Sequence, residues 1–168
     1  MHGSALNGKV PERMRPAIIA LGANLGDRAE TLNAALAAVE ACGNKVLARS
    51  SFHETSPVGY LNQPDFLNAV ALIGVPDNVA PEDFLSQLLA IEIRFGRERP
   101  FPNAPRTLDL DLIFFENEVR RTSFLMLPHP RWQERDFVKI PLREMFFALG
   151  ERVPACFVAL YASLFDRR

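Results

Sequence analysis

Two aspartates, Asp109 and Asp111, interrupt an otherwise apolar segment, residues 108–115. Side chains two residues apart on a strand point to the same face, so the two carboxylates would project together, roughly 7 Å apart along the chain. Carboxylate oxygens suit Mg²⁺, which is commonly held by one or two carboxylates while water and substrate phosphates complete its coordination. The pattern favours a catalytic site in which Asp109 and Asp111 share a pair of magnesium ions.

The alternative interpretation of this segment is an exposed edge strand whose charges are simply solvated. Leu108, Leu110 and Leu112 would form one apolar face of the strand, and Ile113 and Phe115 are expected to continue the face of the aspartates. Charges on a face that continues into large apolar side chains need a cause other than solvation. This arrangement favours the metal site over the solvated edge.

Four arginines lie just upstream of the aspartates: Arg94, Arg97, Arg99 and Arg106. The segment that carries the last three contains three prolines, which indicates a loop. The planar guanidinium donates two hydrogen bonds to phosphate oxygens and keeps its charge at every relevant pH. We therefore expect Arg97 and Arg106 to clamp a phosphate beside the aspartates. For Arg94 and Arg99 taken alone, a solvated basic loop is an equal alternative.

Three further features carry weaker signals. Residues 22–27 lie between a predicted strand and a predicted helix, but they lack both the P-loop ending and the three-glycine spacing of a dinucleotide site. Phe66 and Asn68 share a strand face and could offer a flat ligand an aromatic surface and an amide, although Phe there is more often core. His129 stands between two prolines and either donates to a phosphate or belongs to a turn.

The elements that must position these residues follow from the hydrophobic pattern. Asp27 and Glu30 resemble a capping box, and Pro81 is suited to the first turn of a second helix. The pattern predicts strands at 17–21, 46–52, 66–75 and 108–115, helices at 27–43 and 81–96, and a further helix after residue 135. This order is the split βαβ arrangement of the ferredoxin-like fold, an α+β sandwich with an antiparallel sheet and helices on one face.

Length and composition limit the size, the binding partners and the compartment that the protein can have. A chain of 168 residues with 48% hydrophobic content is the size of one domain, and a formal charge of −1 gives no global field for nucleic acid or an anionic membrane. Two cysteines are too few for a disulfide framework, which favours the cytoplasm. No segment has the apolar length of a membrane span or a signal peptide. We predict a flexible N-terminal extension at 1–15 and one domain at 16–168.

Six segments of the chain, taken in order, resemble the 6-hydroxymethyl-7,8-dihydropterin pyrophosphokinase family, which moves the diphosphate of ATP onto a pterin alcohol. These segments comprise residues 21–27, 51–55, 63–68, 96–97, 105–111 and 128–142. The string Arg-Thr-Leu-Asp-Leu-Asp, which ends at Asp111, is the most specific of them. One departure is that Pro102-Asn103-Ala104 stands where the family usually carries Arg-Trp-Gly, in a segment that could act as a catalytic lid.

The resemblance implies a role for individual residues. Asp109 and Asp111 match the pair that holds two Mg²⁺ ions, with ATP as co-substrate. The residues expected to contact the nucleotide are Arg97, Arg99, Arg106, Leu112, Met126 and His129, of which Arg97 and Arg106 are also expected to be catalytic. The residues expected to form the pterin pocket are Thr55, Val58, Phe66, Asn68, Arg135 and Phe137.

The resemblance also implies an activity. We expect a cytoplasmic, Mg-dependent pyrophosphokinase of folate biosynthesis that produces AMP and a pterin diphosphate, acts on small molecules only and is a monomer. The alternative is a non-catalytic ferredoxin-like module that keeps the nucleotide and pterin pocket for binding or regulation. The retained aspartates and arginines argue against this alternative, while the altered lid segment argues for it.

Overall fold

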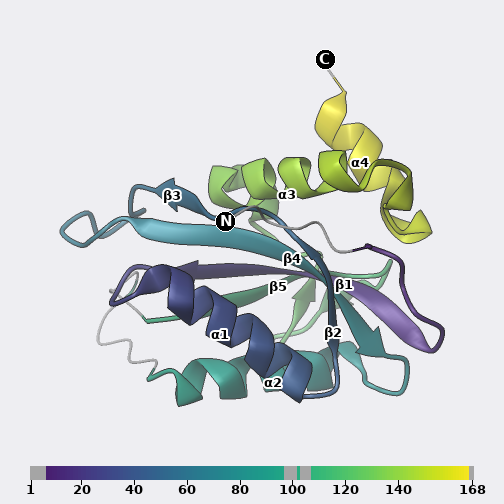
Figure 1. Cartoon of the computed structure of the whole chain (residues 1–168), viewed down its shortest axis with the longest axis horizontal. Helices are drawn as coiled ribbons and strands as arrows, with labels where there is room; N and C mark the ends of the chain where they lie inside the picture. Colours follow the sequence, from purple (N-terminus) through teal and green to yellow (C-terminus); the bar gives the residue numbers. More distant parts are fainter. Residues whose placement is uncertain (1–6, 97–101, 103–106, 167–168) are drawn as a thin grey trace.

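The computed structural model describes residues 7–96, 102 and 107–166 (Figure 1). The strands are β1 (Met14–Ala23), β2 (Lys45–Arg49), β3 (His53–Thr55), β4 (Phe66–Pro76), β5 (Asp109–Phe115), β6 (Arg120–Arg121) and β7 (Met126–Leu127). The helices are α1 (Arg28–Ala41), α2 (Pro81–Arg94), α3 (Asp136–Leu149) and α4 (Val158–Phe165). Within these ranges, no helix combines the length and the apolar character needed to cross a membrane.

The main sheet has the strand order β2-β4-β1-β5, and all of its neighbouring strands are antiparallel. Helix α1 connects β1 with β2, and β4 lies between these two strands in the sheet. Helix α2 connects β4 with β5, and β1 lies between those two. Each βαβ unit is therefore split by a strand of the other unit. This topology confirms the predicted ferredoxin-like α+β fold.

The helices cover both faces of the sheet, so the expectation that they lie on one face is wrong. Helices α1 and α2 pack on one face and α3 on the other (Figure 1). The reason lies in the two central strands: β1 is buried from Pro16 to Ala23 and β4 from Phe66 to Val75 without alternation. A strand that is apolar on both sides requires cover on both sides.

Local signals place the first two helices as the sequence predicts. The Asp27 side chain caps α1 by accepting a hydrogen bond from the Glu30 N–H at 3.1 Å, which satisfies a backbone donor that has no partner inside the helix. Helix α2 begins with Pro81, whose missing N–H costs nothing at that position. The Asp27 cap and Pro81 mark where the two helices begin.

A β-bulge in β5 changes which side chains share a face with the aspartates. In the pairing with β1, Leu112 lies opposite Ile19 and Phe114 opposite Ile18, so Ile113 is the extra residue. Ile113 packs on the α3 face as predicted, but Phe115 packs on the face of α1 and α2. The expectation that Phe115 continues the aspartate face is therefore wrong, because strict alternation ends at the bulge.

Both described ends of the chain contact the rest of the fold. Strand β1 begins at Met14, inside the segment predicted as an extension, and the Gly8 N–H donates to the Leu47 carbonyl oxygen at 3.0 Å. Residues 7–15 are therefore partly attached to the sheet. At the other end, α4 follows α3 through two short 3₁₀ turns and lies beside it (Figure 1).

Candidate active site

One row of paired residues crosses four strands and contains predicted metal-binding and ring-binding residues. Asp109 of β5 lies opposite Gly22 of β1, Gly22 lies opposite Asn68 of β4, and Asn68 lies opposite His53 of β3. Asp111 lies one step further along, opposite Ala20. The fold thus aligns the aspartate pair and the ring-binding amide, which are about 40 positions apart in sequence, across the width of the sheet.

The two aspartates face α3, as the alternation of β5 requires. Leu110 and Leu112 point into the core under α1 and α2, so Asp109 and Asp111 point to the other face, where both are half-buried. Among the described residues, no group of three or more His, Cys, Asp or Glu side chains could hold a metal ion. A divalent ion held by this pair would take its remaining ligands from substrate phosphates and water, which is the usual situation for Mg²⁺.

Arg135 brings a positive charge to the aspartates from the start of α3. It is the residue that precedes the helix, and its Nη1 lies 3.5 Å from Asp111 Oδ2. Its guanidinium also lies 5.5 Å from the centre of the Phe137 ring. Arg135 therefore links the carboxylate pair to the aromatic ring predicted to stack on the pterin.

His129 approaches the end of β5 from the loop after β7. Its backbone N–H donates to the Ile113 carbonyl oxygen at 2.9 Å, and its Nδ1 accepts from the Arg131 N–H at 3.1 Å. Burial lowers the pKa of His129, and the charges of Arg135 and Arg131 lower it further, while Asp109 opposes them. A neutral imidazole that accepts at Nδ1 carries its proton on Nε2, so His129 can donate a hydrogen bond to an anion.

The lowered pKa of His129 predicts a stability loss in acid. Below the ordinary histidine pKa of about 6.5, the unfolded chain binds a proton that the folded protein resists, so the free energy of unfolding falls as the pH drops through that value. In His129→Asn, whose side-chain oxygen can still accept from Arg131, the fall in melting temperature between pH 7 and about pH 5.5 should be smaller than in the parent. An equal or larger fall would contradict this assignment.

The amide of Asn68 lies between Thr55 and Gly22. Its Nδ2 donates a hydrogen bond to Thr55 Oγ1 across the β3–β4 ladder. A Cβ built on Gly22 would lie 2.9 Å from Asn68 Oδ1 and 3.8 Å from the Phe66 ring, so only glycine leaves this space open. The structural role of Gly22 was not predicted, although a glycine inside a strand often marks a close approach. Thr55, Phe66 and Asn68 are thus brought together as predicted.

The loop before β4 is attached to the beginning of α1. Asn24 is buried and its Nδ2 donates to Gln63 Oε1 at 2.8 Å and to the Pro64 carbonyl oxygen at 3.1 Å. Arg28 donates to the Asp65 carbonyl oxygen at 2.9 Å. Val58, at the other end of this loop, is 64% exposed. The loop is therefore anchored on the side of Asn24 while Val58 is open to a ligand.

Several predicted nucleotide-binding residues are not placed with the aspartates. The Leu112 side chain is 3% exposed and lies on the opposite face of β5. Met126 is exposed on the β6–β7 ribbon. Arg97, Arg99 and Arg106 lie outside the described residues, as do Asn103 and Ala104 of the altered lid segment.

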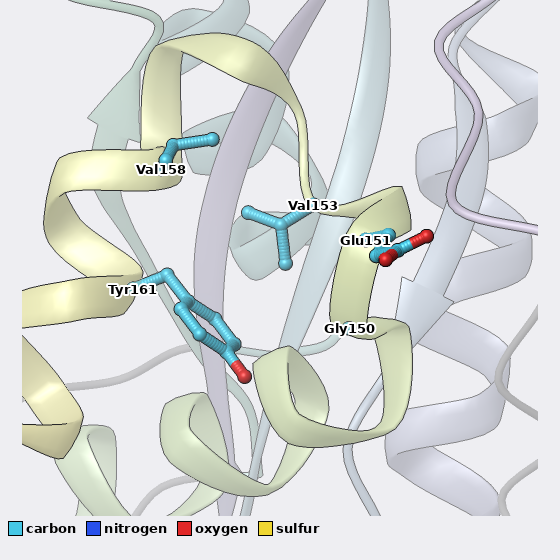
Figure 2. Close-up of a pocket in the computed structure, with 5 residues that line it drawn as sticks. All are labelled: Gly150, Glu151, Val153, Val158 and Tyr161. Atoms are coloured by element: carbon cyan, nitrogen blue, oxygen red, sulfur yellow. The ribbon is translucent and has the colours of Figure 1, made fainter.

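A separate apolar pocket of about 320 Å³ lies at the far end of α3 (Figure 2). It is lined by Gly150, Glu151, Val153, Val158 and Tyr161, and Val153 and the Tyr161 ring project toward the same space. None of the predicted site residues lines it. The chemistry-bearing side chains gather at the other end of α3, near Arg135.

Two curated proteins match this chain over most of its length. A curated Haemophilus influenzae protein named 2-amino-4-hydroxy-6-hydroxymethyldihydropteridine pyrophosphokinase is 40% identical over 133 residues, which cover 79% of this chain and 82% of that protein. A Bacillus subtilis protein with the same name is 40% identical over 130 residues, which cover 77% of each chain.

A longer relative matches over a similar stretch. The Folic acid synthesis protein fol1 of Pneumocystis carinii is 36% identical over 143 residues, which cover 85% of this chain. The matched stretch makes up 19% of that protein, so this chain corresponds to about a fifth of its length.

The family profile described as 7,8-dihydro-6-hydroxymethylpterin-pyrophosphokinase matches residues 18–146, a range that runs from β1 into α3. This range contains every described residue of the predicted site. Because the profile covers most of the chain and two relatives match along most of both sequences, the chain belongs to the 7,8-dihydro-6-hydroxymethylpterin-pyrophosphokinase family.

Proposed function

We propose that this protein transfers the diphosphate of ATP to 6-hydroxymethyl-7,8-dihydropterin, giving AMP and the pterin diphosphate in folate biosynthesis. Membership of a pyrophosphokinase family supports the reaction class. The observation that carries the proposal is the row across the sheet, in which Asp109 and the Asn68 amide are separated only by Gly22. A ring bound at Asn68 would have its hydroxymethyl group directed along this row toward the aspartates.

The pterin would bind between strand and helix. Phe66 and Phe137 supply the aromatic surfaces, and Asn68 with Thr55 supplies the hydrogen-bonding wall for the polar ring edge. Val58 and Arg135 border the same space, from the loop after β3 and from the start of α3. The described contacts of Asn68, Thr55 and Arg135 support this assignment because they fix these side chains before a ligand arrives.

The nucleotide would bind through positive charge and a histidine donor. Arg97, Arg99 and Arg106 would contact the triphosphate, with Arg97 and Arg106 closest to the transferred group. The neutral His129 would donate from Nε2 to a phosphate oxygen. Leu112 and Met126 would border the adenine, where Leu112 would contribute through its backbone because its side chain is in the core.

The aspartate pair fits two magnesium ions. Asp109 and Asp111 would hold them, and the bound ions would offset charge on the phosphate oxygens. The half-buried carboxylates on one strand face are the donor set that such ions prefer. Arg135 would leave Asp111 for the pterin side of the pocket as the positive charge of the metals replaces its own.

The reaction requires alignment more than a protein nucleophile. A bond forms between the pterin hydroxyl oxygen and the β-phosphorus, and the bond from that phosphorus to the bridging oxygen of the α-phosphate breaks, which releases AMP. The hydroxyl proton passes to Asp111 or to water. The protein holds the two substrates in line and stabilises the charge that develops on the transferred group through Arg97 and Arg106.

We further propose that residues 16–168 act as a single catalytic domain in the cytoplasm, that the protein is a monomer, and that it binds small molecules rather than nucleic acid or membranes. The formal charge of −1 supports the last point.

The identity of the adenine product tests the proposed function. In a mixture of protein, ATP, Mg²⁺ and the pterin alcohol, nucleotide analysis should find AMP in equal amount to the pterin diphosphate, and chelation of Mg²⁺ should stop the reaction. Formation of ADP in proportion to the pterin would contradict the proposal. Pterin binding without any transfer would instead support the non-catalytic module.

A further inference from the structure

A cluster outside the proposed substrate contacts joins α3 to the edge of the sheet. Glu144 of α3 accepts hydrogen bonds from the Ser51 N–H at 2.7 Å, from the Ser51 hydroxyl at 2.8 Å and from His53 Nε2. One carboxylate thus receives two donors from Ser51, in the segment that connects β2 with β3, and a third from His53, the first residue of β3. Strand β3 contacts α3, which makes this convergence possible (Figure 1).

The charge on Glu144 is maintained by these donors. Burial by itself would raise the pKa of Glu144, but the backbone and side-chain hydrogen bonds from Ser51 and the contact with His53 lower it below its ordinary value. The carboxylate is therefore ionised at neutral pH, when hydrogen bonds to it are charge-assisted and stronger than neutral ones.

Both partners of this cluster belong to elements that form the pterin pocket. Glu144 follows Phe137 by seven residues on α3, so the two lie on the same side of the helix, about 10 Å apart along its axis. His53 lies opposite Asn68 in the β3–β4 ladder, and Thr55 on the same strand accepts from the Asn68 amide. Glu144 therefore connects α3, which carries Phe137, to β3, which carries Thr55 of the hydrogen-bonding wall.

Strand β3 needs such an anchor. It contains three residues, pairs with β4 and lies at the edge of the sheet. A ladder this short provides few hydrogen bonds of its own, and edge segments of this kind open locally at low cost. The orientation of the Thr55 hydroxyl, and through it of the Asn68 amide, thus depends on what holds β3 from outside the sheet.

We propose that Glu144 is a positioning residue for the ring substrate: by binding Ser51 and His53 it fixes β3 against α3 and so orients the Thr55–Asn68 wall. This inference rests on the proposed function, since it assigns that wall to the pterin. It adds a determinant of substrate affinity that makes no contact with substrate.

Glu144→Gln tests the proposal with little change in shape. The amide has one acceptor oxygen in place of two and adds an N–H₂ that faces donors, so the cluster should separate. We expect the dissociation constant of the pterin alcohol, measured by calorimetry in the presence of a non-hydrolysable ATP analogue, to rise about tenfold. The affinity for the analogue alone should not change. Glu151→Gln, which removes an exposed carboxylate beyond the end of α3, is the matched control and should bind like the parent.

A double-mutant cycle separates positioning from general stability. If Glu144 acts through Thr55, the effect of Glu144→Gln on pterin affinity should be largely lost in a Thr55→Val background. Additive effects in the cycle would overturn the proposal. If Glu144→Gln does not fold, two variants of His53 replace it. His53→Phe removes the donor to Glu144 and should weaken pterin binding. His53→Gln keeps a donor and should bind the pterin more tightly than His53→Phe.

The outcomes also distinguish this inference from the proposed function. A parent protein that neither binds nor converts the pterin alcohol would overturn the function itself. A parent that does both, together with a Glu144→Gln variant of unchanged pterin affinity, would overturn only the role of Glu144. Equal losses of pterin and nucleotide affinity would show a general structural effect and would also overturn it.

Discussion

Asp109→Asn and Asp111→Asn should each lower turnover on the order of 1,000-fold or more, because several kcal/mol of transition-state stabilisation accompanies the metal ions that these carboxylates would hold. Each substitution removes one ligand and one negative charge without changing side-chain volume. Single-turnover transfer from ATP to the pterin alcohol measures the effect. Calorimetric titration of Mn²⁺ into the protein with a non-hydrolysable ATP analogue should show the loss of metal binding directly.

The stability of these variants separates a metal site from a structural one. Replacing Asp109 relieves repulsion between two nearby carboxylates, so the melting temperature should hold or rise. Replacing Asp111 also removes the partner of Arg135, but this pair is 3.5 Å long and both side chains are about a quarter to a third exposed, so the loss should stay within about 4 °C.

Asp77→Asn is the matched control for the aspartate variants. Asp77 is exposed in the turn after β4, so its replacement removes a carboxylate without touching the proposed site. Its turnover and melting temperature should equal those of the parent. Turnover of Asp109→Asn or Asp111→Asn within about tenfold of the parent would contradict the metal site, and a large drop in their melting temperature would favour a structural role.

Asn68→Leu should weaken binding of the pterin alcohol on the order of 100-fold or more, with little change in affinity for an ATP analogue. A site built to hydrogen-bond a polar ring loses most of its affinity when a buried partner is replaced by an apolar side chain, because the ring groups are then desolvated without compensation. The leucine fills a similar volume, so the fold should persist. Calorimetric titration of the pterin alcohol measures the loss, and thermal melting checks the fold.

Thr55→Val provides an internal scale for this result. It removes the hydroxyl that accepts from Asn68 Nδ2 but leaves the amide in place, so the loss of pterin affinity should be smaller, about tenfold. The expected order of affinity is parent, Thr55→Val, then Asn68→Leu. If Asn68→Leu binds the pterin alcohol like the parent, other residues form the hydrogen bonds to the ring and the proposed pocket is wrong.

The sequence was sufficient to predict the fold class and to single out a candidate chemical centre. Apolar runs and helical spacing predicted the long strands and helices because burial of apolar side chains dominates over local preference in elements of that length. Asp109 and Asp111 were identified because ionised side chains are costly in an apolar strand and therefore require a cause. Asp27 was predicted as a cap from purely local hydrogen bonding, which the structure reproduces.

The tertiary structure decided features that depend on distant partners. Strand β3 was missed because His53-Glu54-Thr55 has no apolar alternation and becomes a strand only by pairing with β4. The bulge at Ile113 arises from the register with β1, which no property of β5 specifies by itself.

The arrangement of the candidate site also depends on distant partners. The sequence by itself indicated which residues are candidates for chemistry, because that depends on residue type and on spacing within one element. Only the tertiary structure placed Asp109, Gly22 and Asn68 in one row, and only it brought Glu144 to Ser51, 93 positions away in the chain. Contacts between distant segments follow from strand register and from packing of whole elements, and these are set by the sum of many weak interactions rather than by any local pattern.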